Sequence, residues 1–278
     1  MTNLLKAIIN IKKRNNFDLS NIKTTSKNRA NGMGEALEYF IKDSFCNSYD
    51  KTSEEKNILY NKEFSYLGNQ NNPPDIIIKN NDAIEVKKID GVKFSDLALN
   101  SSYPKSKLYS NSPMITSACK NCEKWTEKDI IYIIGHVDND KLKVLSLVYG
   151  DCYAANKEIY ERTSEKIKTE IKELDLDFSE TKELGRINKV DPLGITYLRI
   201  RGMWGIQNPL KVYEEHMKIN GNKFELFAIM RKSKYESFSK EDIKEFENTS
   251  GILINDIKIK NPDNPAKLID TKLIVVRI

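Results

Sequence analysis

Three charged residues in the segment "NPPDIIIKNNDAIEVKKID" have the types and spacing that could organise a divalent cation. Asp75 begins one apolar run, while Glu85 and Lys87 alternate with Ile84 and Val86 in the next. Because strand side chains alternate between faces, Glu85 and Lys87 would share one face of a strand. Antiparallel pairing across the "NND" turn would then bring Asp75 and Glu85 together.

Two neighbouring carboxylates repel each other, so keeping both ionised requires a compensating cation. Oxygen ligands in a chain with two histidines favour a hard ion such as Mg²⁺, which also binds phosphate. The ammonium group of Lys87 near such an ion would stabilise an attacking water and the charge that develops on a phosphate. The pattern indicates phosphodiester hydrolysis, although a simple hairpin with exposed polar residues would show the same short motif.

Composition narrows the class of protein that could carry this chemistry. The chain has 278 residues, of which 39% are hydrophobic and 31% charged, as in globular proteins that bury a substantial core. Its apolar runs are shorter than the roughly 18 residues of a membrane-spanning helix, and the first residues show no secretory cleavage pattern. We therefore expect a cytoplasmic protein with no membrane partner.

The four cysteines show no disulfide-scaffold spacing. Cys119 and Cys122 form a C-x-x-C pair in a predicted helix at 114–127, but structural zinc would require two further ligands. The two histidines, His136 and His216, are each isolated in the sequence. Buried thiols are therefore favoured over zinc or redox chemistry, and a histidine general base is not expected.

The charged residues would be positioned by helices that lead the chain and by strands that dominate its middle and its C-terminal part. Helical periodicity predicts helices at 3–13, 32–45, 153–174, 209–219 and 240–248. Apolar runs and alternation predict strands at 63–67, 75–79, 83–89, 129–137, 142–150, 194–202, 223–230, 252–260 and 272–278. Since no clean linker interrupts the chain, we expect one α/β domain over residues 1–278 with a β-rich C-terminal extension.

Excess positive charge is concentrated between residues 182 and 211. The whole chain carries 45 Lys and Arg against 40 Asp and Glu, and this segment holds six basic residues against two acidic ones. A localised basic stripe suits a polyanion such as DNA. A solvated surface with local charge balance would look the same.

The three charged positions match the PD-(D/E)xK nuclease signature, here "PD" and "EVK", and "GMGEALE" resembles the G-x-x-L-E helix of that superfamily. Longer blocks resemble the NgoPII family of type II restriction endonucleases, among them "NRANGMGEALEYFIKD", "AIEVKKI" and "ETKELGRINKVDPLGITYLRIRGMWGIQNP". These blocks run from about residue 28 to about residue 268, so the resemblance covers nearly the whole chain.

The resemblance implies an Mg²⁺-dependent endonuclease that cuts double-stranded DNA at a short palindrome, which is GGCC for this family. It implies a restriction-endonuclease-like core, a central mixed β-sheet flanked by helices, with a catalytic region at about 28–150 and a DNA-recognition region at about 180–278. By position, Asp75, Glu85 and the carbonyl of Val86 are metal ligands, Lys87 is the catalytic lysine and Glu38 is the helix acid.

The basic block suggests which residues contact DNA. Arg199 and Arg201 would share one strand face, and arginine binds the O6 and N7 atoms of guanine bidentately. We expect one of these arginines to read bases, with phosphate contacts from Arg186, Lys189, Lys105 and Lys107. Backbone contacts are also expected from Asn71, Asn72, Ser101, Ser102 and Tyr103, although turn formation would explain the same residue types.

A palindromic target predicts a homodimer in which each subunit cuts one strand. A DNA methyltransferase is expected in the same restriction-modification system, but not as a bound partner. Two other functions stay open at this point: a repair or junction-resolving nuclease with the same signature, and a DNA-binding regulator that performs no chemistry.

Overall fold

Apolar alternation produces a large mixed β-sheet in the computed structural model, which describes residues 1–26, 28–69, 72–91, 93–112 and 114–278. Strands β3 and β6 pair in parallel, as do β7 and β12, while the other neighbours are antiparallel. Across the sheet the order is β1 (Phe64–Asn69), β2 (Asn72–Ile78), β3 (Ala83–Asp90), β6 (Glu127–Asp138), β7 (Lys141–Tyr149), β12 (Glu225–Arg231), β14 (Asn264–Arg277) and β13 (Ile252–Asn261), and β5 (Lys107–Tyr109) also pairs with β6.

The predicted α/β architecture, a central mixed sheet flanked by helices, is confirmed. The β-rich C-terminal part continues the sheet, because β12 pairs directly with β7. The turn between β6 and β7 uses Asn139 and Asp140 with φ of 48° and 63°, a left-handed conformation that these two residue types tolerate.

Helices cover the sheet with aliphatic and aromatic faces. The main ones are α1 (Leu4–Lys12), α2 (Arg29–Cys46), α3 (Ser53–Glu63) and α9 (Lys240–Glu247). Leu37, Phe40 and Ile41 of α2 are buried, and α2 packs against the strand β3. The helix α3 was not predicted from periodicity, although Thr52 and Glu55 form a capping box at its start, which is a recognisable sequence signal.

Several predicted helices are shorter than expected. The predicted helix at 114–127 is wrong: α4 covers Ser117–Lys120, ends at Asn121, and β6 begins at Glu127. The predicted helix at 153–174 is α6 (Lys157–Lys172), and a separate single turn, α5 (Gly150–Tyr153), precedes it. The helix expected at 209–219 is the single turn α7 (Pro209–Val212), and the short α8 (Lys232–Glu236) was not predicted.

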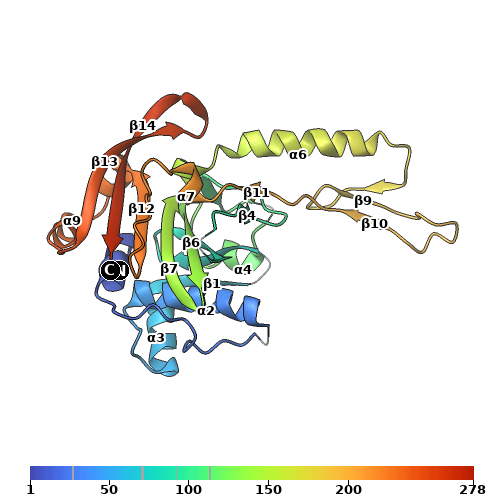
Figure 1. Cartoon of the computed structure of the whole chain (residues 1–278). Coiled ribbons are helices and arrows are strands. Elements are labelled where there is room, and N and C mark those ends of the chain that lie inside the picture. Colours follow the sequence, from blue (N-terminus) through green and yellow to red (C-terminus); the bar gives the residue numbers. More distant parts are fainter. Residues whose placement is uncertain (27, 70–71, 92, 113) are drawn as a thin grey trace.

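An arm made of α6 and three short strands projects from the body (Figure 1). The strands β8 (Phe178–Ser179), β9 (Gly185–Ile187) and β10 (Leu198–Ile200) form a separate antiparallel sheet. The strand predicted at 194–202 is therefore reduced to its central three residues. None of the side chains of α6 is buried, because this helix runs beyond the edge of the body.

Aromatic packing and a short ladder join the arm to the body. Tyr103 stacks on Tyr160 of α6 with ring centroids 5.4 Å apart, and Trp204 meets Tyr160 edge-on at 5.6 Å. Strand β4 (Leu97–Ala98) pairs with β11 (Gly205–Ile206), and the Trp204 N–H donates to the Asn100 carbonyl. Trp204 thus packs beside the core, as Trp125 also does.

Within the part of the chain that the structure describes, no helix has the length and apolar character needed to cross a membrane. The thiols of all four cysteines are free, and burial raises the pKa of Cys119 to about 12. The prediction of buried thiols is confirmed for Cys119 and Cys152, whereas Cys46 and Cys122 are half-buried.

Candidate active site

The antiparallel pairing of β2 with β3 brings the two predicted acids together. Ile76 lies opposite Ile84 and Ile77 opposite Ala83, so Asp75 is placed beside Glu85. The Val86 N–H donates a hydrogen bond of 2.6 Å to Oδ2 of Asp75. Ile84 and Val86 are buried, which fixes the face of β3 on which Glu85 and Lys87 lie.

Gly68 in β1 allows Asp75 to occupy its position. A Cβ atom at Gly68 would lie 2.6 Å from the Pro74 carbonyl oxygen and 2.8 Å from Cα of Asp75. Real Cβ contacts are not that short, and both neighbours belong to the backbone. Glycine at this position is therefore required for β1 to approach the segment that carries the acid.

Lys87 is held as a cation between the acids. Its Nζ atom lies 2.6 Å from Oε1 of Glu85. Burial lowers the pKa of Lys87, but the negative charges of Glu85 and Asp75 outweigh that effect and raise the pKa above its ordinary value. Lys87 therefore stays protonated and is suited to stabilise charge, not to act as a base.

The carboxyl group of Asp75 is in an unfavourable environment when ionised. Burial raises its pKa well above the ordinary value, and the charge of Glu85 raises it further, although Lys87 opposes both. The second oxygen of Glu85, Oε2, is buried and has no hydrogen-bond partner among the described residues. Oε2 of Glu85 therefore has coordinating capacity that the described protein groups leave unused.

A cavity of about 460 Å³ opens in front of these residues. Asp75, Glu85 and Lys87 line it together with residues from the 99–105 loop and from the base of the arm. Seven of the predicted DNA-contacting residues also line it: Asn72, Ser101, Ser102, Tyr103, Lys105, Arg199 and Arg201. One concave surface thus joins the predicted catalytic residues to the predicted base-reading arginines.

Lys105 lies in this cavity as a buried cation. Its side chain donates hydrogen bonds to Ser102 Oγ and, over 3.2 Å, to the Tyr103 carbonyl, and none of the described ion pairs includes it. Burial lowers its pKa to about 8, although the charge of Glu85 opposes the shift. Its backbone N–H donates to the hydroxyl of Tyr132, whose strand position is next to Glu85.

Other predicted site residues lie away from the cavity. Glu38 of α2 is coupled electrostatically to it: burial raises the pKa of Glu38, Lys42 and Lys87 lower it, and Glu85 raises it. In the arm, Lys189 pairs with Asp177 at 3.1 Å, and Arg186 stacks on the ring of Tyr197 at 3.7 Å. Asn71 lies outside the described residues.

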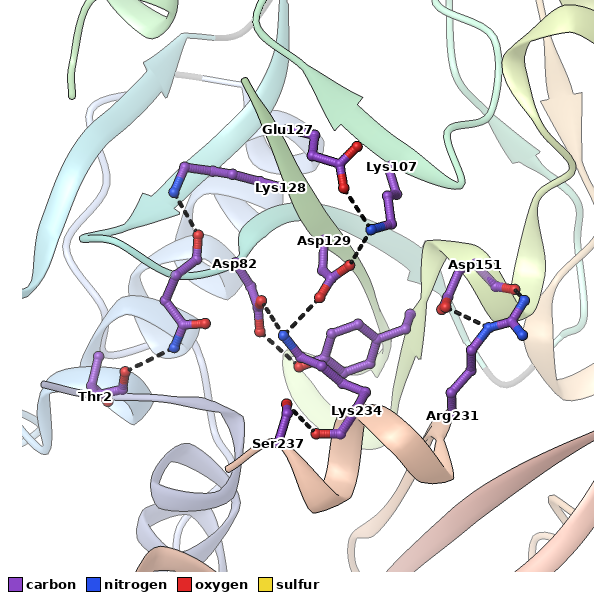
Figure 2. A network of polar contacts seen from close by, with 12 residues as sticks. Thr2, Asp82, Lys107, Glu127, Lys128, Asp129, Asp151, Arg231, Lys234 and Ser237 are labelled. Atoms are coloured by element: carbon purple, nitrogen blue, oxygen red, sulfur yellow. Dashed lines mark hydrogen bonds and ion pairs between the residues drawn. The ribbon is translucent and has the colours of Figure 1, made fainter. Parts of the chain in front are cut away.

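Lys107 belongs to a separate polar network behind the catalytic strands. Figure 2 shows its Nζ between Glu127, at 2.9 Å, and Asp129, at 3.5 Å. Lys234 of α8 reaches Asp82 at 2.6 Å and Asp129 at 2.8 Å from the other side. Because Asp82 immediately precedes β3, this network fixes the start of the strand that carries Glu85.

Glu183 was not predicted as a site residue, yet it occupies the centre of the arginine group. It lines the cavity and accepts hydrogen bonds from Arg199, Arg201 and Ser101. The sequence signal that could have found it is an isolated acid within the basic segment "TKELGRINK". The count of charges between residues 182 and 211 treated Glu183 only as an acid that balances nearby basic residues.

Among the described residues, which include Asp75, Glu85 and Glu38, no group of three or more His, Cys, Asp and Glu side chains is arranged to hold a metal ion. His136 is buried, with Nδ1 3.2 Å from the Gly91 carbonyl and Nε2 3.2 Å from Asn208, and burial lowers its pKa. The described lining of the cavity includes no histidine.

Comparison with known proteins places the chain in a family. A family model described as NgoPII restriction endonuclease matches residues 2–260. The chain belongs to the NgoPII restriction endonuclease family. The type II restriction enzyme NgoPII from Neisseria gonorrhoeae is 48% identical over 279 residues, covering 99% of this chain and 100% of the relative. No solved structure matches the chain.

Membership in the NgoPII family confirms the resemblance predicted from the sequence blocks. The family consists of type II restriction endonucleases, which are DNA hydrolases, and the mixed α/β fold agrees with that class. The roles of the individual site residues stay predictions, which the geometry above makes specific.

Proposed function

We propose that this member of the NgoPII family is an Mg²⁺-dependent endonuclease that hydrolyses double-stranded DNA at GGCC. The observation that carries the proposal is one cavity lined by Asp75, Glu85 and Lys87 at its floor and by Arg199 and Arg201 on its wall. The first group suits phosphodiester hydrolysis, and the second suits guanine recognition.

The residues present fit a hard divalent cation. Asp75 and Glu85 offer oxygen atoms only, and the unpartnered Oε2 of Glu85 is available as a ligand. A bound cation would offset the burial and the repulsion by Glu85 that together raise the pKa of Asp75. Mg²⁺ held by Asp75, Glu85 and the Val86 carbonyl would activate a water molecule and neutralise charge on the scissile phosphate.

The protein's own side chains would orient the remaining parts of the reaction. Lys87 is protonated and lies next to Glu85, so it would hold an attacking water by hydrogen bonding and stabilise the charge that develops on the phosphate. Glu38, on the helix that packs against β3, would hold a further water at the edge of the site. Lys105 would supply a second positive charge toward the phosphate.

The finer parts of the proposal concern the target and the assembly. Two arginines at one site match the two guanines in each strand of GGCC, and Asn72, Ser101 and Ser102 would contact the DNA backbone nearby. The two-fold symmetry of the target favours a homodimer. The activity would belong to a cytoplasmic restriction-modification system that also includes a DNA methyltransferase.

The test is digestion of a long duplex with and without Mg²⁺. The wild-type protein should give discrete bands whose ends map to GGCC, and chelation should abolish them. Lys87→Ala should reduce cleavage by about 10³-fold, because the loss of one preorganised charge-stabilising group costs on that order. Lys88→Ala is the matched control, since Lys88 pairs with the exposed Asp90 and should leave cleavage near wild-type.

The outcomes separate the proposal from its rivals. Smeared products or selective cutting of branched junctions would indicate a structure-specific nuclease, and retardation of duplex DNA with no cutting would indicate a binding protein. For the metal site, Mg²⁺ should raise the melting temperature of the wild-type protein and leave Asp75→Asn unchanged. Equal stabilisation of both proteins would contradict the assignment of Asp75.

A further inference from the structure

We propose that Glu183 is a positioning residue that aims Arg199 and Arg201 at guanine and thereby determines sequence specificity. This inference rests on the proposed function, because it concerns how the same cavity would read its target. It adds an acidic residue to a recognition surface that the sequence presents as basic.

One carboxylate binds both arginines. Oε2 of Glu183 accepts from Nε of Arg199 at 2.8 Å and lies 2.8 Å from Nη2 of the same side chain. Oε1 accepts from Nε of Arg201 at 2.8 Å. The hydroxyl of Ser101 donates to Oε1 at 2.5 Å, so the carboxylate is also tied to the loop beside the catalytic strands.

On each arginine, the contacts to Glu183 leave Nη1 and the second hydrogen of Nη2 available. A guanidinium group has a side edge, formed by Nε and Nη2, and an end edge, formed by Nη1 and Nη2. The contacts to Glu183 and Ser101 use the side edges of both arginines. Their end edges remain available for bidentate hydrogen bonds to O6 and N7 of guanine.

Burial and charge keep this arrangement in place. The Glu183 side chain is 5% exposed, whereas those of Arg199 and Arg201 are 56% and 59% exposed. Burial raises the pKa of Glu183, but hydrogen bonds from Ser101 and Arg201 and the two positive charges bring it below the ordinary value. A buried anion therefore lies beneath two exposed cations and restricts their rotamers before DNA arrives.

The strand pairing of the arm explains why both arginines reach one acid. Arg199 lies opposite Arg186 in the β9–β10 pair, and Ile200 lies opposite Gly185. Glu183 precedes β9 by two residues, while Arg201 follows β10 directly. The end of this strand pair therefore gathers the three side chains at the cavity wall.

The experiment compares cleavage by the wild-type protein, Glu183→Ala and Glu183→Gln. The substrates are a GGCC duplex, duplexes with one base pair changed, and a GGCC duplex with 7-deazaguanine, which lacks the N7 acceptor. Glu183→Ala should raise KM for GGCC and reduce discrimination against changed sites by roughly 10- to 100-fold, as expected when a bidentate contact loses its geometry. Its preference for guanine over 7-deazaguanine should fall in parallel.

The control variants distinguish a loss of arginine positioning from a loss of folding and from a change in charge. Glu183→Gln keeps the size of the side chain and part of its hydrogen bonding, so its discrimination should be intermediate. Glu180→Gln alters an exposed acid that pairs with Lys172 in the same segment, and its discrimination should equal the wild-type value. Binding of Glu183→Ala to unrelated duplex should not weaken, because the variant loses a negative charge.

Unchanged discrimination in Glu183→Ala, or faster cleavage of GGCC by that variant, would overturn the inference. Faster cleavage would mean that the carboxylate sequesters the arginines. If the wild-type protein itself fails to cut at discrete sites, the proposed function fails instead, and the two failures are thereby distinguished. Should Glu183→Ala melt cooperatively at a much lower temperature, Glu183→Gln alone decides: full wild-type discrimination in it would contradict the role of the charge.

Discussion

At the residue scale, Lys105 shows how function and stability oppose each other in this cavity. Its ammonium group is buried, and no carboxylate among the described residues pairs with it. The unfolded chain keeps the same group in water, so the folded protein carries a desolvation cost as long as Lys105 is charged. An anionic phosphate in the cavity would offset that cost.

The prediction is that Lys105→Met stabilises the DNA-free protein near neutral pH. The folded-state pKa of about 8 lies below the ordinary 10.5, so the cost is present below pH 8 and disappears between pH 8 and 10.5. A shift of this size corresponds to at most about 3 kcal/mol, and lost hydrogen bonds will reduce the gain. Denaturant unfolding of the wild-type protein and of Lys105→Met, at about pH 7 and about pH 9.5, measures the difference in their free energy of unfolding.

The control and the functional consequence follow from neighbouring residues. Lys107 pairs with Glu127 and Asp129, and these acids raise its pKa, so Lys107→Met should give no stabilisation. Lys105→Met should lower DNA cleavage by at least about tenfold, because a charge facing the phosphate is removed. An equal gain in stability at both pH values would show that desolvation of the ammonium is not its cause.

At the element scale, the close approach of β1 to β2 determines where Asp75 lies. Gly68→Ala should displace the backbone at Pro74 and Asp75, because the new Cβ atom would lie within 2.8 Å of both residues. A displacement near 1 Å at reacting groups can reduce rates by about 10²-fold, so cleavage should fall on that scale. Steady-state cleavage assays and thermal melts of the variant provide the measurement.

A matched substitution separates this effect from a general response to alanine. Gly34 lies within α2, and a Cβ atom added to it would meet no described atom within 4 Å. Gly34→Ala should therefore stabilise the helix by roughly 0.5–1 kcal/mol and leave the sheet unchanged. Wild-type cleavage by Gly68→Ala would mean that Asp75 does not depend on this contact.

The sequence predicted most of the elements that hold the proposed catalytic residues. The alternation around Glu85 and Lys87 correctly assigned their face, and the Asn-rich turn correctly implied a hairpin with β2, since these signals are local. The helix expected at 114–127 was wrong because α4 ends after one turn at its C-cap Asn121, and the chain then leads into β6, which begins at Glu127. The capping box of α3 was present but unused.

The residues of the cavity wall were harder to predict than the acids and the lysine at its floor. Arg199 and Arg201 were proposed from residue type, but their shared partner Glu183 was not, because it lies 16 and 18 residues before them in sequence and meets them through the β9–β10 pair. Lys105 and Lys107 look equivalent in sequence. The structure buries the first in the cavity and pairs the second with acids, a difference set by tertiary packing.

At the scale of the whole molecule, the arm exposes apolar side chains that a free surface seldom carries. Leu193 and Ile195, between β9 and β10, are 81% and 75% exposed. Ile159 and Ile167 on α6 and Val190 in the hairpin are also exposed. An extended group of such residues is typical of a surface that meets a partner. The proposed homodimer supplies one.

The prediction is that the protein sediments at twice the mass of its chain and that Leu193→Ser with Ile195→Ser shifts it toward the monomer. Apolar contacts buried between subunits would be lost, so cleavage of both strands in one encounter should decline. Sedimentation velocity over a concentration series measures the first effect, and the ratio of nicked to linear plasmid measures the second. An unchanged dimer would place the interface elsewhere.

The pairing of β4 with β11 has a consequence for fidelity. Main-chain hydrogen bonds join the hairpin that carries Arg199 and Arg201 to the loop that leads into Ser101 and Lys105. The connection is therefore not a flexible linker. Any shift of the hairpin caused by an incorrect base would therefore be transmitted as a backbone movement to the catalytic floor. An incorrect base in the target would therefore slow hydrolysis itself. Near-matching sites in a chromosome would stay uncut even after the protein has bound to them.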